Sequence, residues 1–134
     1  MADSTTYDLI VVGSGGGGLS AGLTAAAAGA SVLILEKTNL IGGSTAMSGG
    51  VLWLPNSQVA ERAGAPDSFD DGMRYFDSVV GEAGPASSHA RRVAFLQRGR
   101  EYIDFIESEG VILQFCDGYA DYYDDRPEIG RAHV

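Results

Sequence analysis

Two short apolar runs flank a glycine-rich segment near the start of the chain. Residues 9–12 and 32–35 are continuously hydrophobic rather than alternating, which is typical of parallel strands covered on both faces. Residues 19–28 combine Leu, Ala, Ser and Thr with one Gly, which favours a helix that Gly29 ends. Strand, glycine-rich turn, helix and strand in this order predict one right-handed βαβ unit and an α/β fold.

The later pattern predicts additional helices. Ser68 and Asp71 resemble a capping box, which predicts a helix over about residues 68–80. A longer helix is expected to open at residues 85–88, to carry an apolar stripe and to stop at Gly110. Residues 38–56 are expected to form a glycine-rich loop and residues 111–115 a strand. Residues 117–125, rich in aspartate and tyrosine, are expected to form a surface loop or a loop that lines the site.

The glycine-rich segment Gly13–Gly18 matches the pattern G-x-G-x-x-G. The pattern alone is weak evidence in a chain with 19 glycines, but here it leaves a predicted strand and enters a predicted helix, as in Rossmann-like dinucleotide-binding units. Gly13 would permit the tight turn, Gly15 the approach of a pyrophosphate, and Gly18 close packing of the helix on the sheet. Free amides at the helix start would face the phosphates.

Glu36 ends the second predicted strand, where an acidic side chain can accept hydrogen bonds from ribose hydroxyls. Its negative charge disfavours a 2′-phosphate, so NADP is not expected. These local features do not separate FAD from NAD, because both present an adenosine and a pyrophosphate. A third alternative is a dinucleotide-binding module without redox chemistry.

Charge and cysteine content remove several other functions. The formal net charge is -9, which repels a phosphate backbone, so nucleic acid is not an expected partner. The single cysteine, Cys116, allows no intrachain disulfide or cysteine-rich metal site and is expected to be a buried filler. No metal site, targeting segment or transmembrane segment is expected, and a cytoplasmic location fits best.

Four groups of residues together carry a family resemblance. They are Asp8–Gly18, Glu36-Lys37, Gly42–Thr45 and Ser48–Gly50. Together they resemble the FAD-binding segment of the fumarate reductase and succinate dehydrogenase flavoprotein superfamily. Within it, residues 48–56 and 118–123 are most similar to the 3-ketosteroid Δ1-dehydrogenases.

The resemblance implies that FAD is the cofactor and assigns its binding residues. Residues 42–45 would follow the FAD phosphates, residues 48–50 would lie along the isoalloxazine ring, and Trp53 would lie near the flavin or in the core. The full expected set is Gly13, Ser14, Gly15, Gly16, Gly17, Gly18, Glu36, Lys37, Gly42, Gly43, Ser44, Thr45, Ser48, Gly49 and Gly50.

The same resemblance implies an oxidoreductase that dehydrogenates a carbon–carbon bond beside a ketone, with a 3-ketosteroid as the leading substrate. Tyr122 is the catalytic candidate. In the steroid enzymes that the chain resembles, a tyrosine in a similar sequence context assists a second tyrosine that removes a proton beside the ketone. Tyr119 and Tyr123 are weaker candidates. The alternative is a fumarate-reductase-like flavoprotein that acts on a small enoate or dicarboxylate.

The end of the chain departs from the family pattern. Residues 129–134, Ile-Gly-Arg-Ala-His-Val, resemble one reading frame of a sequencing adaptor. We therefore expect residues 1–128 to be the N-terminal part of an FAD-binding domain with an incomplete sheet, and residues 129–134 to be a non-native tail. Such a fragment would bind FAD weakly or not at all, and it would not turn over substrate on its own.

Overall fold

The computed structural model describes residues 5–65, 67–119 and 123, and it divides into two compact units. The first unit spans residues 1–50 and the second spans residues 51–134. No linker composition in the sequence marked the boundary at Gly50. Each unit is described by itself below.

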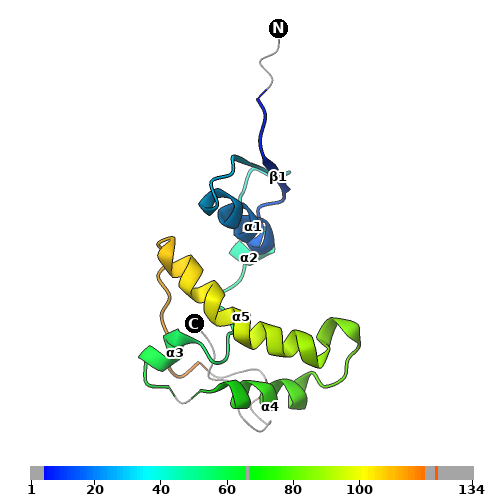
Figure 1. Ribbon diagram of the computed structural model, residues 1–134. Helices are drawn as coiled ribbons and strands as arrows, with labels where there is room; N and C mark the ends of the chain where they lie inside the picture. The colour runs from blue at the N-terminus through cyan, green and yellow to red at the C-terminus, as the bar shows by residue number, and fades with distance from the viewer. Residues whose placement is uncertain (1–4, 66, 120–122, 124–134) are drawn as a thin grey trace. The chain divides into compact units, whose positions relative to one another are not determined.

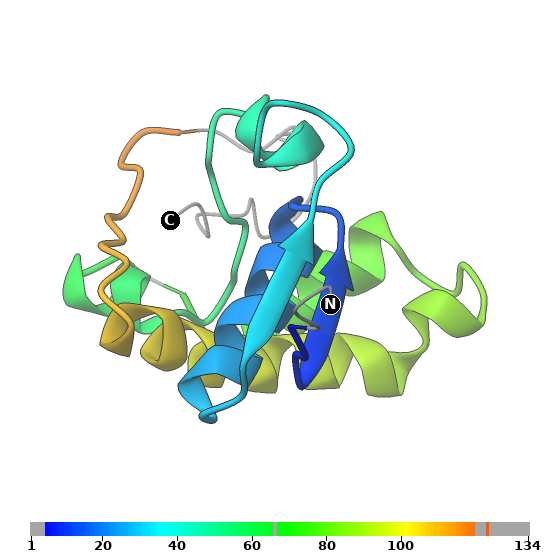
Figure 2. The same ribbon diagram turned by 90° about the horizontal axis from the view of Figure 1, so that it is seen from above.

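The first unit is the predicted βαβ unit. Strand β1 (Leu9–Val12) and strand β2 (Val32–Leu35) are parallel, with Leu9 beside Val32 and Val12 beside Leu35. Figure 2 shows the two strands as neighbouring arrows with helix α1 (Gly16–Ala27) beside them. This confirms the predicted strand, glycine-rich turn, helix and strand.

Helix α1 covers one face of this two-stranded sheet. Gly22 in α1 is buried, and a Cβ on it would lie 3.1 Å from Ile34 and 3.7 Å from Val32. The helix therefore approaches β2 at a position where only glycine fits without a shift. On the opposite face, the side chains of Ile10, Val12 and Leu35 are exposed. One face of the sheet is thus covered in the first unit and the other is open, which agrees with the incomplete sheet expected from the sequence.

Helix α1 begins earlier than its composition predicted. It starts at Gly16 rather than at Leu19, because the last glycines of the motif adopt helical backbone and form its first turn. A second difference is helix α2 (Gly43–Ala46), a single turn inside the segment predicted as loop. Gly42 precedes it with a φ of 109°, a left-handed conformation that glycine adopts without strain.

The second unit is helical. It contains α3 (Gln58–Arg62), α4 (Phe69–Val79), the 3₁₀ turn η1 (Pro85–Ser87) and α5 (His89–Ser108). In Figure 1 the chain turns back between α4 and α5, and these two helices pack against each other. The predicted cap of α4 is confirmed, since the Ser68 hydroxyl accepts a hydrogen bond from the Asp71 amide at 3.1 Å. The short helix α3 was not predicted.

The core of the second unit lies along α5. Leu96 and Ile103 of α5 have 0% exposure. Two glycines allow close packing here: a Cβ on Gly72 would lie 2.9 Å from Leu96, and a Cβ on Gly99 would lie 2.7 Å from Leu54. The predicted apolar stripe of α5 is therefore the face that the core buries.

The strand predicted at residues 111–115 was wrong. The structure assigns no strand there, and Ile112 is 85% exposed. Instead, Leu113 and Phe115 pack against a cluster of buried residues formed by Leu54, Val59, Ile103 and Ile106. Apolar composition selected this segment, but a strand also needs a paired neighbour. Cys116, which follows, is only partly buried.

Candidate functional site

The glycine-rich loop connects β1 to α1 with the geometry that a phosphate-binding turn requires. Gly13 has a φ of 95°, and its amide donates to the Leu35 carbonyl at 2.7 Å, which joins the loop to the end of β2. A Cβ on Gly18 would lie 2.1 Å from the Gly13 carbonyl oxygen, so no side chain fits there. A Cβ on Gly15 would meet nothing within 4 Å. The predicted roles of Gly13 and Gly18 in the turn and in the close helix approach therefore match the backbone, and Gly15 leaves open space.

The carboxylate of Glu36 faces this loop. Its Oε2 atom accepts hydrogen bonds from the Ser14 amide at 3.0 Å and from the Ser14 hydroxyl at 2.6 Å, while Oε1 accepts one from the Thr38 amide at 3.1 Å. These bonds, led by the Ser14 hydroxyl, lower the pKa of Glu36 to about 2. The residue is therefore ionised at neutral pH, and an ionised carboxylate accepts stronger hydrogen bonds from hydroxyl groups than a neutral acceptor does.

Helix α2 lies beside the start of α1. The Gly16 amide donates to the Thr45 hydroxyl at 3.0 Å, and the Gly42 amide donates to the Ser14 hydroxyl at 3.0 Å. A Cβ on Gly43 would lie 3.4 Å from the Gly15 Cα atom. Residues 42–45 thus lie against the glycine-rich loop.

The segment that follows α2 is exposed and turns on glycine. The Ser48 hydroxyl donates to the Thr45 carbonyl at 2.8 Å and accepts from the Gly50 amide at 3.1 Å. Gly50 has a φ of 75°, and a Cβ on Gly49 or Gly50 would meet nothing within 4 Å. Lys37 and Ser44, two other expected contacts, are also exposed.

The remaining residues considered in the sequence analysis lie in the second unit or outside the described residues. Tyr122, the catalytic candidate, lies outside the described residues. Tyr119 and Tyr123 are 51% and 48% exposed. Trp53 packs in the second unit, with ring centroids 5.2 Å from Tyr75, 5.3 Å from Phe76 and 6.2 Å from Phe95. This cluster accounts for Trp53 as a packing residue of the second unit.

The described part of the chain contains neither a metal-binding cluster nor a helix that could span a membrane. Among residues 5–65, 67–119 and 123, no group of three or more His, Cys, Asp or Glu side chains is arranged to hold a metal ion. No helix in the same residues is long and apolar enough to cross a membrane.

The residues of the first unit fit the adenosine diphosphate part of FAD. The loop leaves open space at Gly15 and Gly17, because a Cβ atom on either residue would have no neighbouring atom within 4 Å. The amides at the start of α1 carry the positive end of the helix dipole. The carboxylate of Glu36, which follows β2, is ionised. Donors for a pyrophosphate and an acceptor for a ribose therefore lie at the same ends of the two strands.

Comparison with known proteins identifies the family. Residues 8–128 match the FAD binding domain family. The 3-oxosteroid 1-dehydrogenase of Mycolicibacterium smegmatis is 39% identical over 122 residues, covering 90% of this chain and 21% of that enzyme. The 4-oxocyclohexanecarboxylate 2-dehydrogenase of Sinomonas cyclohexanicum is 41% identical over 124 residues, covering 92% of this chain and 21% of that enzyme.

A solved structure agrees with these relatives. The 3-ketosteroid Δ1-dehydrogenase of Sterolibacterium denitrificans, in complex with 1,4-androstadiene-3,17-dione, is similar with a TM-score of 0.77 and 36% identity. The match covers 97% of this chain and 23% of that chain. The present chain therefore spans about a fifth of the length of its curated relatives, and it belongs to the FAD binding domain family.

Proposed function

We propose that the first unit binds the adenosine diphosphate part of FAD. Amides at the start of α1 receive the pyrophosphate, and the Glu36 carboxylate accepts a ribose hydroxyl. The observation that supports this most directly is the position of the ionised Glu36 carboxylate. Two hydrogen bonds from Ser14 hold it against the glycine-rich loop. Thr45 adds a hydroxyl whose oxygen already accepts the Gly16 amide, so its proton is free to reach a phosphate oxygen.

The protein that carries this segment is proposed to be an FAD-dependent dehydrogenase of cyclic ketones. The names of the two relatives describe the same chemistry, because in both the dehydrogenated ring position is two carbons from the oxo carbon. Removal of hydrogen there forms a double bond conjugated with the ketone. A 3-ketosteroid is the leading substrate, and a smaller oxocyclohexane is the second member of the same class.

The reaction divides between the cofactor and the protein. FAD, when bound, accepts a hydride from one carbon, and a base removes a proton from the neighbouring carbon so that the double bond forms. A free phenol has a pKa near 10, so a tyrosine base needs a hydrogen-bonding neighbour. We assign that supporting role to Tyr122. We also propose that the backbone of residues 48–50, which carry little side-chain bulk, lies along the isoalloxazine ring.

The test uses the flavin-loaded protein that contains this segment. Under anaerobic conditions, addition of a 3-ketosteroid is expected to bleach the yellow flavin and to yield a 1,2-unsaturated product detectable by mass spectrometry. Replacement Tyr122→Phe is expected to slow the bleaching while the amount of bound FAD stays unchanged. Bleaching by an oxocyclohexane carboxylate alone would narrow the substrate to the smaller ring.

Other outcomes would contradict the proposal. Re-oxidation of the reduced flavin by fumarate or another enoate, with no response to ketones, would favour a fumarate-reductase-like enzyme. A colourless protein that retains only NAD would exclude a flavoenzyme.

Two further predictions stay open. One is a cytoplasmic location. The other is the division into residues 1–128 and a non-native tail at 129–134, which genomic DNA that encodes the tail followed by a stop codon would refute.

A further inference from the structure

The two strands of the first unit are joined at both ends by a serine and a carboxylate. Before the strands, Asp8 Oδ2 accepts hydrogen bonds from the Ser31 amide at 2.8 Å and the Ser31 hydroxyl at 2.7 Å. After the strands, Glu36 Oε2 accepts from the Ser14 amide at 3.0 Å and the Ser14 hydroxyl at 2.6 Å. Each pair therefore holds one carboxylate oxygen with two donors from one residue.

The two pairs differ in burial and in further bonding. Asp8 and Ser31 are exposed, whereas Ser14 has 0% exposure. The Ser14 hydroxyl also accepts the Gly42 amide at 3.0 Å. This one hydroxyl thus connects the glycine-rich loop, the residue that follows β2 and the residue that precedes α2. The serine at the other end of the strands has no corresponding link to a third segment among the hydrogen bonds of the described residues.

The second oxygen of Glu36 keeps capacity for another donor. Oε1 accepts the Thr38 amide at 3.1 Å, and the Thr38 hydroxyl lies 3.3 Å away. That hydroxyl has one proton, and the Leu40 carbonyl lies closer to it, at 2.7 Å. The proton therefore goes mainly to Leu40, and Oε1 retains a lone pair. Oε2, in contrast, is held by both Ser14 donors.

We infer that Ser14 is a positioning residue that holds Oε2 of Glu36 so that Oε1 is the oxygen that accepts the adenosine ribose hydroxyl. This inference rests on the proposed function and adds to it which residue orients the carboxylate and which oxygen is used. Without the Ser14 hydroxyl, the carboxylate keeps only the Ser14 amide on that oxygen and can rotate away from the sugar. The Gly42 amide would also lose its acceptor.

The experiment measures FAD binding to the flavin-free form of the protein that contains this segment, by quenching of flavin fluorescence. Replacement Ser14→Ala is expected to raise the dissociation constant at least about tenfold, since a hydrogen bond to a charged group is lost. In a Glu36→Ala background, the same replacement is expected to change it by less than about threefold, because the oriented group is already absent. Ser31→Ala is the matched control, because it removes the equivalent bond at the other end of the same strands and is expected to leave FAD affinity unchanged.

Other results would overturn the inference alone or the inference together with the proposed function. An equal loss of affinity with and without Glu36 would mean that Ser14 acts only through loop structure and would overturn the inference. If Ser14→Ala does not fold, the near-isosteric Ser14→Cys keeps a weak donor and is expected to bind FAD with intermediate affinity; wild-type affinity in that variant would also overturn it. An unsubstituted protein that binds no FAD would refute the proposed function together with the inference, whereas normal FAD binding by Ser14→Ala would refute the inference alone.

Discussion

At the scale of single residues, the glycines of the loop are not equivalent. A Cβ on Gly18 would lie 2.1 Å from the Gly13 carbonyl oxygen, a distance that real side chains do not adopt, whereas a Cβ on Gly17 would meet nothing within 4 Å. Replacement Gly18→Ala must therefore displace the loop or the start of α1. We expect a clear loss of thermal stability and of bound FAD, measured by thermal unfolding and by flavin content after purification.

The neighbouring glycine provides the control for stability. Gly17 lies in the first turn of α1, where alanine is favoured over glycine by up to about 1 kcal/mol. Gly17→Ala is therefore expected to leave the unfolding temperature unchanged or slightly raised. Equal destabilisation by both replacements would show that the short distance at Gly18 is not what excludes a side chain.

Glu36 gives a pH-dependent contribution to stability. Its pKa falls from 4.5 to about 2 on folding, mainly through the Ser14 hydroxyl. Because the folded pKa lies below the unfolded one, the ionised carboxylate stabilises the fold above pH 4.5, and this contribution is lost as the pH falls towards 2. Glu36→Gln is expected to flatten this part of a curve of urea midpoint against pH. An unchanged slope between these pH values would contradict the assignment.

Candidate residues for the site could be predicted from the sequence, but not the hydrogen bonds among them. The spacing of the glycines predicted Gly13, Gly15 and Gly18 as candidates, and the end of the second apolar run predicted Glu36. Nothing in a periodic pattern indicates that the Ser14 hydroxyl meets Glu36 22 residues later and Gly42 28 residues later. Such contacts depend on where the loop carries a small polar side chain in three dimensions. The bond between Gly16 and Thr45 was unforeseen for the same reason.

At the scale of helices and strands, the contact between α4 and α5 depends on Leu96. This side chain has 0% exposure, and its methyl groups lie against the backbone of Gly72 in α4. Leu96→Ala is expected to destabilise the second unit by about 2–5 kcal/mol, the usual range for a buried leucine. Urea unfolding measures this, with the exposed neighbour Gln97→Ala as the control. A change below about 1 kcal/mol would mean that the site repacks around the smaller side chain.

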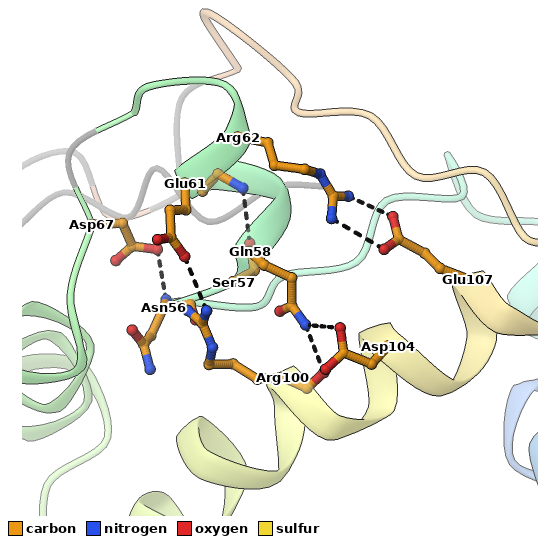
Figure 3. A network of polar contacts seen from close by, with 10 residues as sticks. Asn56, Ser57, Gln58, Glu61, Arg62, Asp67, Arg100, Asp104 and Glu107 are labelled. Carbon is orange, nitrogen blue, oxygen red and sulfur yellow. Dashed lines mark hydrogen bonds and ion pairs between the residues drawn. The ribbon is translucent and has the colours of Figure 1, made fainter.

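A polar network joins α3 and its flanking loops to α5, as Figure 3 shows. Arg100 donates to the Asn56 carbonyl and to Glu61, each at 2.9 Å, and Gln58 donates to the Arg100 carbonyl at 2.9 Å. Next to these residues, Asp67 accepts the Asn56 amide at 2.6 Å. Asn56 itself has a φ of 60°, a left-handed conformation that this hydrogen bond helps to hold.

Two replacements of Asp67 show whether its hydrogen-bond acceptor or its negative charge contributes more to stability. Burial raises the pKa of its carboxyl group, so ionisation of the folded protein is less favourable than ionisation of the unfolded chain. Asp67→Ala leaves the Asn56 amide without an acceptor and is expected to lower the unfolding temperature at neutral pH. Asp67→Asn keeps an acceptor without the charge, so we expect a smaller change. A larger loss in the asparagine variant would show that the charge itself stabilises this loop.

The helices and strands that the sequence predicted correctly are those with a strong local signal. Strands β1 and β2 are uninterrupted apolar runs, and α4 has a serine cap at Ser68. The single turn of α2 and the short helix α3 span too few residues for a period to appear. At residues 111–115 the composition favoured a strand, but Leu113 and Phe115 gain their burial by packing on a helical core. Tertiary contacts, and not local strand preference, therefore determine the conformation of residues 111–115.

For the chain as a whole, the open face of the sheet in the first unit is expected to promote association between molecules. Val12 is 85% exposed and Ile10 is 55% exposed on this face. An apolar strand face of this kind promotes association between molecules. We expect Val12→Thr to reduce self-association of the chain, measured by light scattering during size-exclusion chromatography. Ile112→Thr is the control, because Ile112 is also 85% exposed but lies outside any strand; an equal effect of both would exclude a special role of the strand face.

The serine and carboxylate pairs at the two ends of the strands also have a consequence for the order of folding. They close loops of 22 and 23 residues, and the bonds to α2 close loops of 28 and 29 residues. Loops of this length close at small entropic cost and lead to rapid assembly. Because all of these bonds join residues fewer than thirty positions apart, the first unit is expected to assemble faster than a sheet whose strands are far apart in the sequence.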